Sequence, residues 1–101
     1  PLISLPKQIA DENNVYHQFP IFCERRDELL EYLKEKGIQT LIHYPIPPHH
    51  QECYAKETWN IPQLSLPISE KIHQLELSIP MNQVISEAEA KEVVDAINSF
   101  R

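Results

Sequence analysis

The first half of the chain changes from a mixed lead-in to a strand pattern and then to a helix pattern. Residues 1–14 carry two prolines and an acidic-amide cluster, which predicts an extended segment with a turn. Residues 15–23, VYHQFPIFC, are rich in aromatic and β-branched side chains and predict a strand. Because Pro20 has no N–H to donate, this strand should bend there or lie at a sheet edge. Residues 24–37 place leucines at helical spacing and end in Gly37, where a left-handed residue is expected.

The second half alternates between short elements of both kinds. Residues 38–43 alternate in polarity and predict a second strand, and residues 49–56 predict a brief helix. Residues 65–74 have a proline in the first turn of a predicted helix, and the alternating residues 75–79 predict a strand after it. A last helix should begin at Ser86, because a glutamate three residues later completes a capping box. This order predicts an α+β fold in one domain over the whole 101-residue chain: a small sandwich of a mainly antiparallel three- to four-stranded sheet with helices on one face.

Composition and charge exclude several classes of protein. With 42% hydrophobic residues, the chain can build one small core. The net charge of −6 and the pI near 5.3 argue against nucleic-acid binding, and no apolar run is long enough to span a bilayer. We therefore expect no nucleic acid and no membrane as partners, and a cytoplasmic location in which Cys23 and Cys53 stay reduced. The first residue, Pro1, is not methionine, which predicts a piece of a longer protein.

Residues 37–54, GIQTLIHYPIPPHHQECY, concentrate histidines, prolines and tyrosines in one stretch. A zinc site built from His43, His49 and His50 is one interpretation, but two adjacent histidines diverge on a strand or a helix, so we expect no metal. Catalysis by Cys53 with a histidine is a second, and no surrounding motif supports it. A third is a wall of rings and phenols that faces a substrate bound mostly by another domain. The residues alone favour, by a small margin, a structural loop whose side chains cap strand ends.

Residues 26–54 and 66–97 contain motifs in a specific order. The first segment has an Arg-Asp helix start, a Gly-Ile turn, a His-Tyr-Pro-x-Pro run, a histidine and a tyrosine, namely Arg26-Asp27, Gly37-Ile38, His43-Tyr44-Pro45-Ile46-Pro47, His49 and Tyr54. The second has a Pro-x-x-Glu helix start and a Leu-Ser-Ile-Pro strand, namely Pro67, Glu70 and Leu77-Ser78-Ile79-Pro80. Together they resemble the C-terminal segment of the DegT/DnrJ/EryC1/StrS family of pyridoxal-phosphate aminotransferases, which act on nucleotide-linked keto sugars. The chain departs from that pattern at Pro48 and His50, where apolar residues are more usual, and at Cys53.

The resemblance implies that this chain is the small C-terminal domain of a fold-type I aminotransferase. The large domain, which binds pyridoxal phosphate through a lysine, would be absent from it. Glutamate would donate an amino group to the keto sugar of a nucleotide sugar, in cell-surface polysaccharide or amino-sugar biosynthesis. The six lysines of this chain lie in polar contexts, and no segment resembles the family's cofactor-lysine segment. We therefore expect no catalytic and no cofactor-binding residue here, and a chain that is inactive and binds no pyridoxal phosphate by itself.

Carried over by position, the resemblance makes His43, Tyr44 and His49 the substrate-binding residues. Their side chains can hydrogen-bond to sugar hydroxyls or diphosphate oxygens and stack against a ring. Arg26 is expected to orient the start of its helix through Asp27 or a nearby carbonyl. The domain would close one side of the substrate cleft and help to shape a homodimer. The family's rarer dehydratase chemistry remains open, and so does the alternative of a free-standing α+β ligand-binding or dimerisation module.

Overall fold

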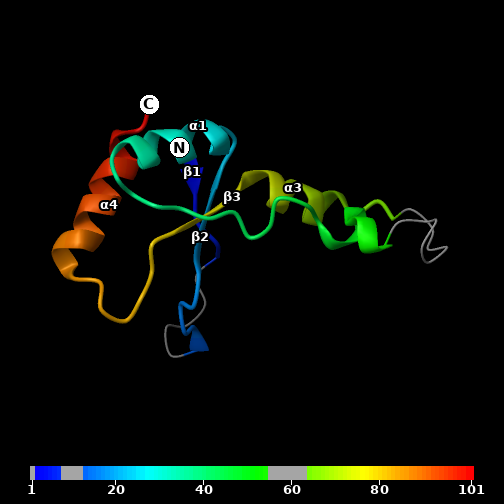
Figure 1. Ribbon diagram of the computed structural model, residues 1–101, viewed down its shortest axis with the longest axis horizontal. Coiled ribbons are helices and arrows are strands. Elements are labelled where there is room, and N and C mark those ends of the chain that lie inside the picture. The colour runs from blue at the N-terminus through cyan, green and yellow to red at the C-terminus, as the bar shows by residue number, and fades with distance from the viewer. Residues whose placement is uncertain (1, 8–12, 55–63) are drawn as a thin grey trace.

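A three-stranded antiparallel sheet organises the fold. The computed structural model describes residues 2–7, 13–54 and 64–101. The strands β1 (Ile3–Ser4), β2 (Phe19–Cys23) and β3 (Glu76–Ile79) lie in the order β1-β2-β3, with β2 in the centre (Figure 1). In register, Ile3 is opposite Cys23 and Ile21 is opposite Leu77. The predicted α+β class and antiparallel sheet are confirmed.

Within the described ranges, three α-helices accompany the sheet: α1 (Arg26–Glu35), α3 (Pro67–Leu75) and α4 (Glu87–Ser99). The helix α1 ends as predicted, because Gly37 adopts φ +78°, a conformation that glycine takes at little cost. The helix α4 begins with the predicted capping box between Ser86 and Glu89. Figure 1 shows α3 leading directly into β3 on the side of the sheet away from α4. None of the helices in the described ranges is long and apolar enough to cross a membrane.

The strand predicted over residues 38–43 does not form. Leu41 makes a single antiparallel bridge with Ser78, through hydrogen bonds of 3.1 and 2.8 Å between their backbones. The chain then leaves the sheet, because the backbone N–H of His43 donates to the side chain of Glu76 instead of to a strand carbonyl. The Glu76 carboxylate thus takes the place of the backbone carbonyl that would accept this hydrogen bond in a longer strand.

One other predicted boundary is wrong, one predicted helix is replaced by two short turns, and one strand was missed. The strand predicted from residue 15 begins only at Phe19, where its pairing with Ile79 starts. Within the extended lead-in, Ile3–Ser4 pairs with the far edge of β2. Two short 3₁₀ turns, η2 (Pro48–His50) and η3 (Glu52–Tyr54), replace the described part of the helix predicted over residues 49–56. Its last two residues lie outside the described part of the chain.

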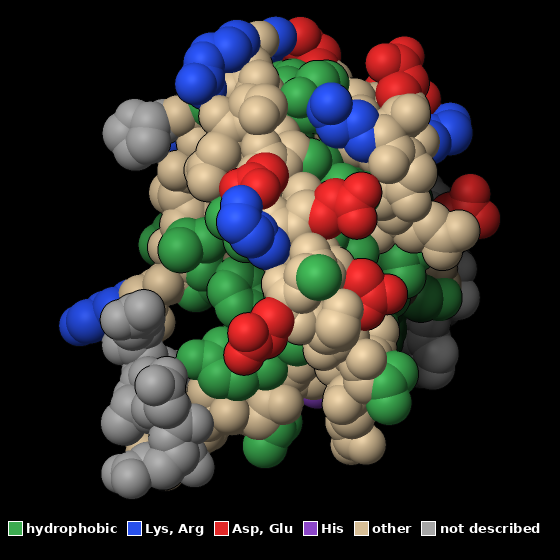
Figure 2. Space-filling model, turned by 90° about the vertical axis from the view of Figure 1, so that its left-hand side faces the viewer, with side chains coloured by type: hydrophobic (Ala, Val, Ile, Leu, Met, Phe, Trp, Pro, Cys, Tyr) green, Lys and Arg blue, Asp and Glu red, His purple; other side chains and the backbone are tan. Residues whose placement is uncertain are grey.

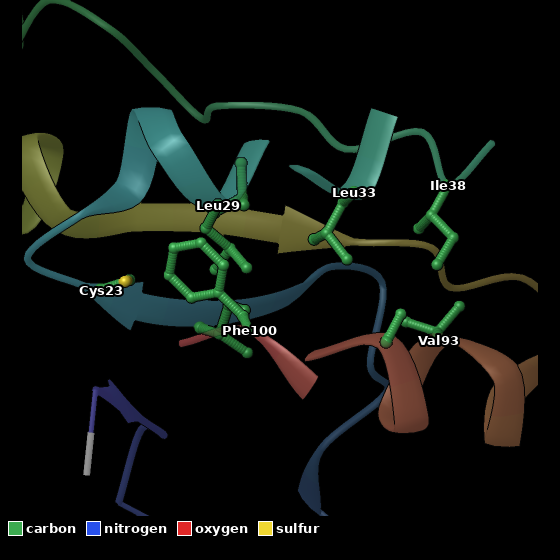
Figure 3. Packing of buried hydrophobic residues seen from close by; sticks show 9 residues of the cluster. Cys23, Leu29, Leu33, Ile38, Val93 and Phe100 are labelled. Carbon is green, nitrogen blue, oxygen red and sulfur yellow. The ribbon is translucent and has the colours of Figure 1, made fainter. Parts of the chain in front are cut away.

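The core lies between the sheet, α1 and α4. It consists of apolar side chains from these elements and from the residues just after α1 and α4, with Leu29 and Leu33 of α1 fully buried: Ile21, Cys23, Leu29, Leu33, Ile38, Leu77, Val93, Ala96 and Phe100. Burial of each such leucine contributes about 1.5–3 kcal/mol. In Figure 3, Ile38 and Val93 point toward each other at one end of this cluster, with Cys23 at the other. Both cysteines are free thiols, as predicted, with Cys23 buried and Cys53 exposed.

An open apolar groove of about 690 Å³ runs between the sheet and α4. Its lining includes Leu5 and Val94, whose side chains are largely exposed, together with Met81 and Ile97. Figure 2 shows apolar side chains gathered on the face of the molecule that α4 occupies, among scattered charged ones. An apolar surface of this size is typical of a domain that packs against further polypeptide.

Candidate functional site

The side chains of two β3 residues fix His43 in place. Its backbone N–H donates to Glu76 Oε2 at 2.7 Å, and its ring Nδ1 lies 2.8 Å from Ser78 Oγ. The Ser78 hydroxyl donates to Glu76 Oε1, so Oγ accepts its second hydrogen bond from a proton on His43 Nδ1. Glu76 and Ser78 are only 4% and 6% exposed. The ring is therefore oriented by a buried network, and within the described residues Nε2 on its other side has no partner.

An open cavity of about 700 Å³ lies beside His43. Its walls come from the segment between Ile38 and His43, the end of β3 and the following turn, and α1. Lys34 and Asn82 contribute a cation and an amide to the lining, and Ile79 contributes apolar surface. This combination suits a ligand with hydroxyl or anionic groups on an apolar frame.

Tyr44 follows His43 but does not line this cavity. Its side chain is 61% exposed, and its ring stands edge-on to the His43 ring, with centroids 5.4 Å apart and an interplanar angle of 86°. The peptide bond between the two residues is cis. The carbonyl oxygen of Tyr44 accepts a hydrogen bond from Nδ1 of His73 on α3. The backbone is thus anchored while the phenol remains open to solvent.

His49, the third predicted site residue, lies in a second cluster. Its Nε2 is 3.0 Å from Glu70 Oε1, and its side chain is only 8% exposed. The same carboxylate oxygen accepts from the backbone N–H of Leu66 at 2.8 Å, at the start of α3. The hydrogen bond with His49, followed by that from Leu66, holds the pKa of the Glu70 carboxyl below its ordinary value. The Nε2 atom of His50 lies 3.9 Å from the same oxygen.

Arg26 orients its helix, as the sequence predicts. Its Nε donates to Asp27 at 2.7 Å, and one terminal nitrogen donates to the backbone carbonyl of His73 at 3.0 Å. The contact with His73 joins the start of α1 to the end of α3. The Arg26 side chain is only 15% exposed, so the contact is largely shielded from solvent.

Sequence reasoning missed Glu76 and Ser78 as members of the site. Both are polar residues in a short strand whose other positions are apolar, and both turn to the face opposite Leu77. A carboxylate in a buried strand needs a partner, since an unpaired buried charge is costly. That pattern was the available signal for a strand that holds a neighbouring polar side chain in place.

The described lysines do not fit the role of holding pyridoxal phosphate. Lys34, Lys71 and Lys91 have side chains that are 70%, 65% and 73% exposed, and each pairs with a carboxylate of Glu31, Glu24 or Asp95. A lysine that forms a Schiff base needs a desolvated setting that favours its neutral amine. Within the described part of the chain, no lysine has one.

Comparison with known proteins identifies the class to which this fold and site belong. Residues 2–98 match the family model of the DegT/DnrJ/EryC1/StrS aminotransferase family. The chain belongs to that family.

Relatives and solved structures agree with this membership. The chain is 44% identical, over 99% of its length, to dTDP-3-amino-3,6-dideoxy-alpha-D-galactopyranose transaminase of Aneurinibacillus thermoaerophilus. It is 39% identical to dTDP-3-amino-3,4,6-trideoxy-alpha-D-glucose transaminase of Streptomyces venezuelae, also over 99%. A crystal structure of S. venezuelae DesV in complex with a ketimine intermediate matches 96% of the chain, with 40% identity and a TM-score of 0.84. The chain spans only 26% of the length of each of these three proteins.

Proposed function

We propose that the complete protein is an aminotransferase that moves an amino group from glutamate to the keto sugar of a nucleotide sugar. This chain is its C-terminal domain, which lines the substrate cleft and is inactive alone. The observation that carries the proposal is the orientation of His43: a buried strand holds its ring through Nδ1, and the residue lines an open cavity. Family membership and the sugar-nucleotide names of the relatives support the choice of substrate class.

The rest of the polypeptide supplies the cofactor site in this proposal. Pyridoxal phosphate provides the electron sink for transamination, and a structure of Bacillus subtilis NtdA that matches this chain with a TM-score of 0.81 contains bound PMP. The exposed, ion-paired lysines described above favour a cofactor lysine outside this domain. The apolar groove beside α4 supports a domain that packs against that remaining polypeptide. A homodimer, a cytoplasmic location and a role in polysaccharide or amino-sugar biosynthesis complete the proposal.

In this proposal His43 and Tyr44 contact the substrate directly. Nε2 of His43 hydrogen-bonds to a sugar hydroxyl or a diphosphate oxygen, and the exposed phenol of Tyr44 does the same from the neighbouring position. The predicted substrate contact of His49 stays a prediction. Its ring is nearly buried against Glu70, which suits a residue that holds this wall of the cleft in shape.

Kinetics of the complete protein test the two contacts. Loss of one hydrogen bond costs about 0.5–1.5 kcal/mol for a neutral partner and about 1.5–3 kcal/mol for a charged one. His43→Ala and Tyr44→Phe should therefore raise KM for the sugar nucleotide by roughly 2-fold to 140-fold, while the cofactor absorbance stays unchanged. Tyr32→Phe is the matched control, because Tyr32 packs against Phe100, away from the cavity. Wild-type kcat and KM in both variants would refute the assignment.

Titration of the isolated chain with pyridoxal phosphate tests the division of labour between domains. We expect no saturable adduct after borohydride reduction, because the described lysines are exposed to solvent and three of them pair with carboxylates. A single lysine modified in stoichiometric yield would place a cofactor site in this chain and contradict the proposal.

A further inference from the structure

Three side chains with metal-binding atoms converge where η2 meets α3. They are His49, His50 and Glu70, and one ligand atom from each lies within 4.8 Å of the other two. The Glu70 oxygen is 3.0 Å from Nε2 of His49 and 3.9 Å from Nε2 of His50. This cluster does not include His43, so it is separate from the network that faces the cavity.

Adjacent histidines can share an ion here because the backbone between them is a 3₁₀ turn. On a strand or an α-helix, neighbouring side chains point in different directions. The tighter winding of η2 brings the two imidazole rings to a centroid separation of 4.2 Å with a tilt of 51°. The sequence-based objection to a site at these two histidines therefore does not hold, although the third ligand is Glu70 and not His43.

The distances suit a small divalent ion. Zinc binds imidazole nitrogen and carboxylate oxygen at about 2.0–2.2 Å, so tetrahedral donors lie roughly 3.3–3.5 Å apart. The separations of 3.0 and 3.9 Å fall on either side of that range. The His50 side chain is 53% exposed and can move to bring these separations into the tetrahedral range. The His49 side chain is nearly buried and fixed.

Each ligand can take the protonation state that a metal requires. In the described part of the chain Oε1 of Glu70 is the oxygen that faces both histidines, and one of its lone pairs can bind an ion while the other keeps the hydrogen bond from Leu66. His49 must offer the lone pair of Nε2, which requires its ring proton to lie on Nδ1. The ion would thus replace the direct hydrogen bond between His49 and Glu70.

We propose that His49, His50 and Glu70 form a binding site for Zn²⁺, with a fourth position open to water. Two imidazoles and one carboxylate are a donor set that zinc takes with an open position, and it suits a borderline ion better than Ca²⁺ or Mg²⁺. The ion joins the turn η2 to the first turns of α3. It therefore fixes the end of the loop that begins at His43. The inference does not depend on the proposed transferase activity.

Uptake of Co²⁺ by the complete protein tests the site, since Co²⁺ replaces Zn²⁺ and shows visible d–d absorption. After removal of metal by a chelator, we expect one Co²⁺ per chain to give the intense bands of a four-coordinate site, and Zn²⁺ to abolish them. His50→Leu removes one ligand but leaves the contact between His49 and Glu70 in place. It should weaken Co²⁺ binding by at least about 10-fold. Glu70→Gln should do the same.

His17→Leu is the matched control, because His17 is exposed and lies outside the cluster. Its Co²⁺ titration should equal that of the wild-type protein. Absence of the d–d bands at equimolar Co²⁺ would overturn the proposal. So would a titration that His50→Leu leaves unchanged, or one that His17→Leu weakens as much as His50→Leu does.

Discussion

Ser78 lies at the centre of the network that orients His43, and its replacement by alanine breaks two hydrogen bonds at once. The hydroxyl donates to Glu76 and accepts from His43, at a position that is 6% exposed. The bond to the carboxylate is worth about 1.5–3 kcal/mol and the one to the ring about 0.5–1.5 kcal/mol. Because such terms are not additive, we expect Ser78→Ala to lower the free energy of unfolding by about 2–3 kcal/mol. This corresponds to a roughly 30- to 140-fold change in the unfolding equilibrium.

Urea unfolding of the 101-residue chain, followed by circular dichroism, measures this loss. Ser99→Ala is the matched control: its hydroxyl donates only to the Asp95 carbonyl on the exposed side of α4. Its effect should stay within about 0.5 kcal/mol. In the complete protein, Ser78→Ala should also raise KM for the sugar nucleotide, because the His43 ring loses its fixed orientation. A stability loss equal to that of Ser99→Ala would refute the network as the device that holds His43.

Two further predictions concern the helix ends. Gly37→Ala should cost about 1–2 kcal/mol from backbone strain alone, because φ is +78° and an added Cβ meets nothing within 4 Å. Gly37→Asn should cost less, because asparagine adopts positive φ more readily than alanine does. Equal melting temperatures for the Gly37→Ala and Gly37→Asn variants would contradict this. The backbone N–H of Ser86, followed by its hydroxyl, holds the pKa of Glu89 below its ordinary value of 4.5. The stability that the Glu89 carboxylate contributes is therefore fully present above the ordinary pKa of 4.5. It is lost as pH falls through the lower pKa of Glu89 in the folded protein. The difference in melting temperature between wild type and Glu89→Gln should shrink below about pH 4.5, and a constant difference would contradict the linkage.

Sequence reasoning identified the elements that depend on local signals. The leucine spacing of α1, its end at Gly37 and the capping box at Ser86 each act within one or two turns of chain. The strand expected over residues 38–43 was wrong for a non-local reason. A residue 33 positions away, Glu76, takes the N–H of His43, and nothing in the local pattern shows that. The pairing of Ile3–Ser4 with β2 was also missed, because two residues are too few to show the alternation of polarity that predicts a strand.

The sequence indicated which segment holds the candidate site, but not which residues from elsewhere in the chain contact it. The motif His-Tyr-Pro-x-Pro directed attention to the segment after α1, because prolines beside aromatic and imidazole rings are visible in the sequence. The partners Glu70, Glu76 and Ser78 lie on a later segment, and only the fold brings them to the loop. Expecting His49 and His50 to diverge was wrong because the 3₁₀ turn was not anticipated.

The continuous segment from α3 through β3 explains why a proline-rich loop with few buried residues keeps its shape. Three of its side-chain contacts in the described residues hold different points of the loop: Glu70 binds His49, His73 binds the carbonyl of Tyr44, and the pair Glu76 and Ser78 binds His43. The helix α3 itself buries no residue, so its amphipathic face does not account for its position. Its place is set instead by β3, which follows without a break, and by Arg26, which binds the His73 carbonyl from α1. The loop is therefore positioned by the core of the domain through one continuous segment. A change in the packing of α1 against β3 should displace His43 more than the exposed phenol of Tyr44.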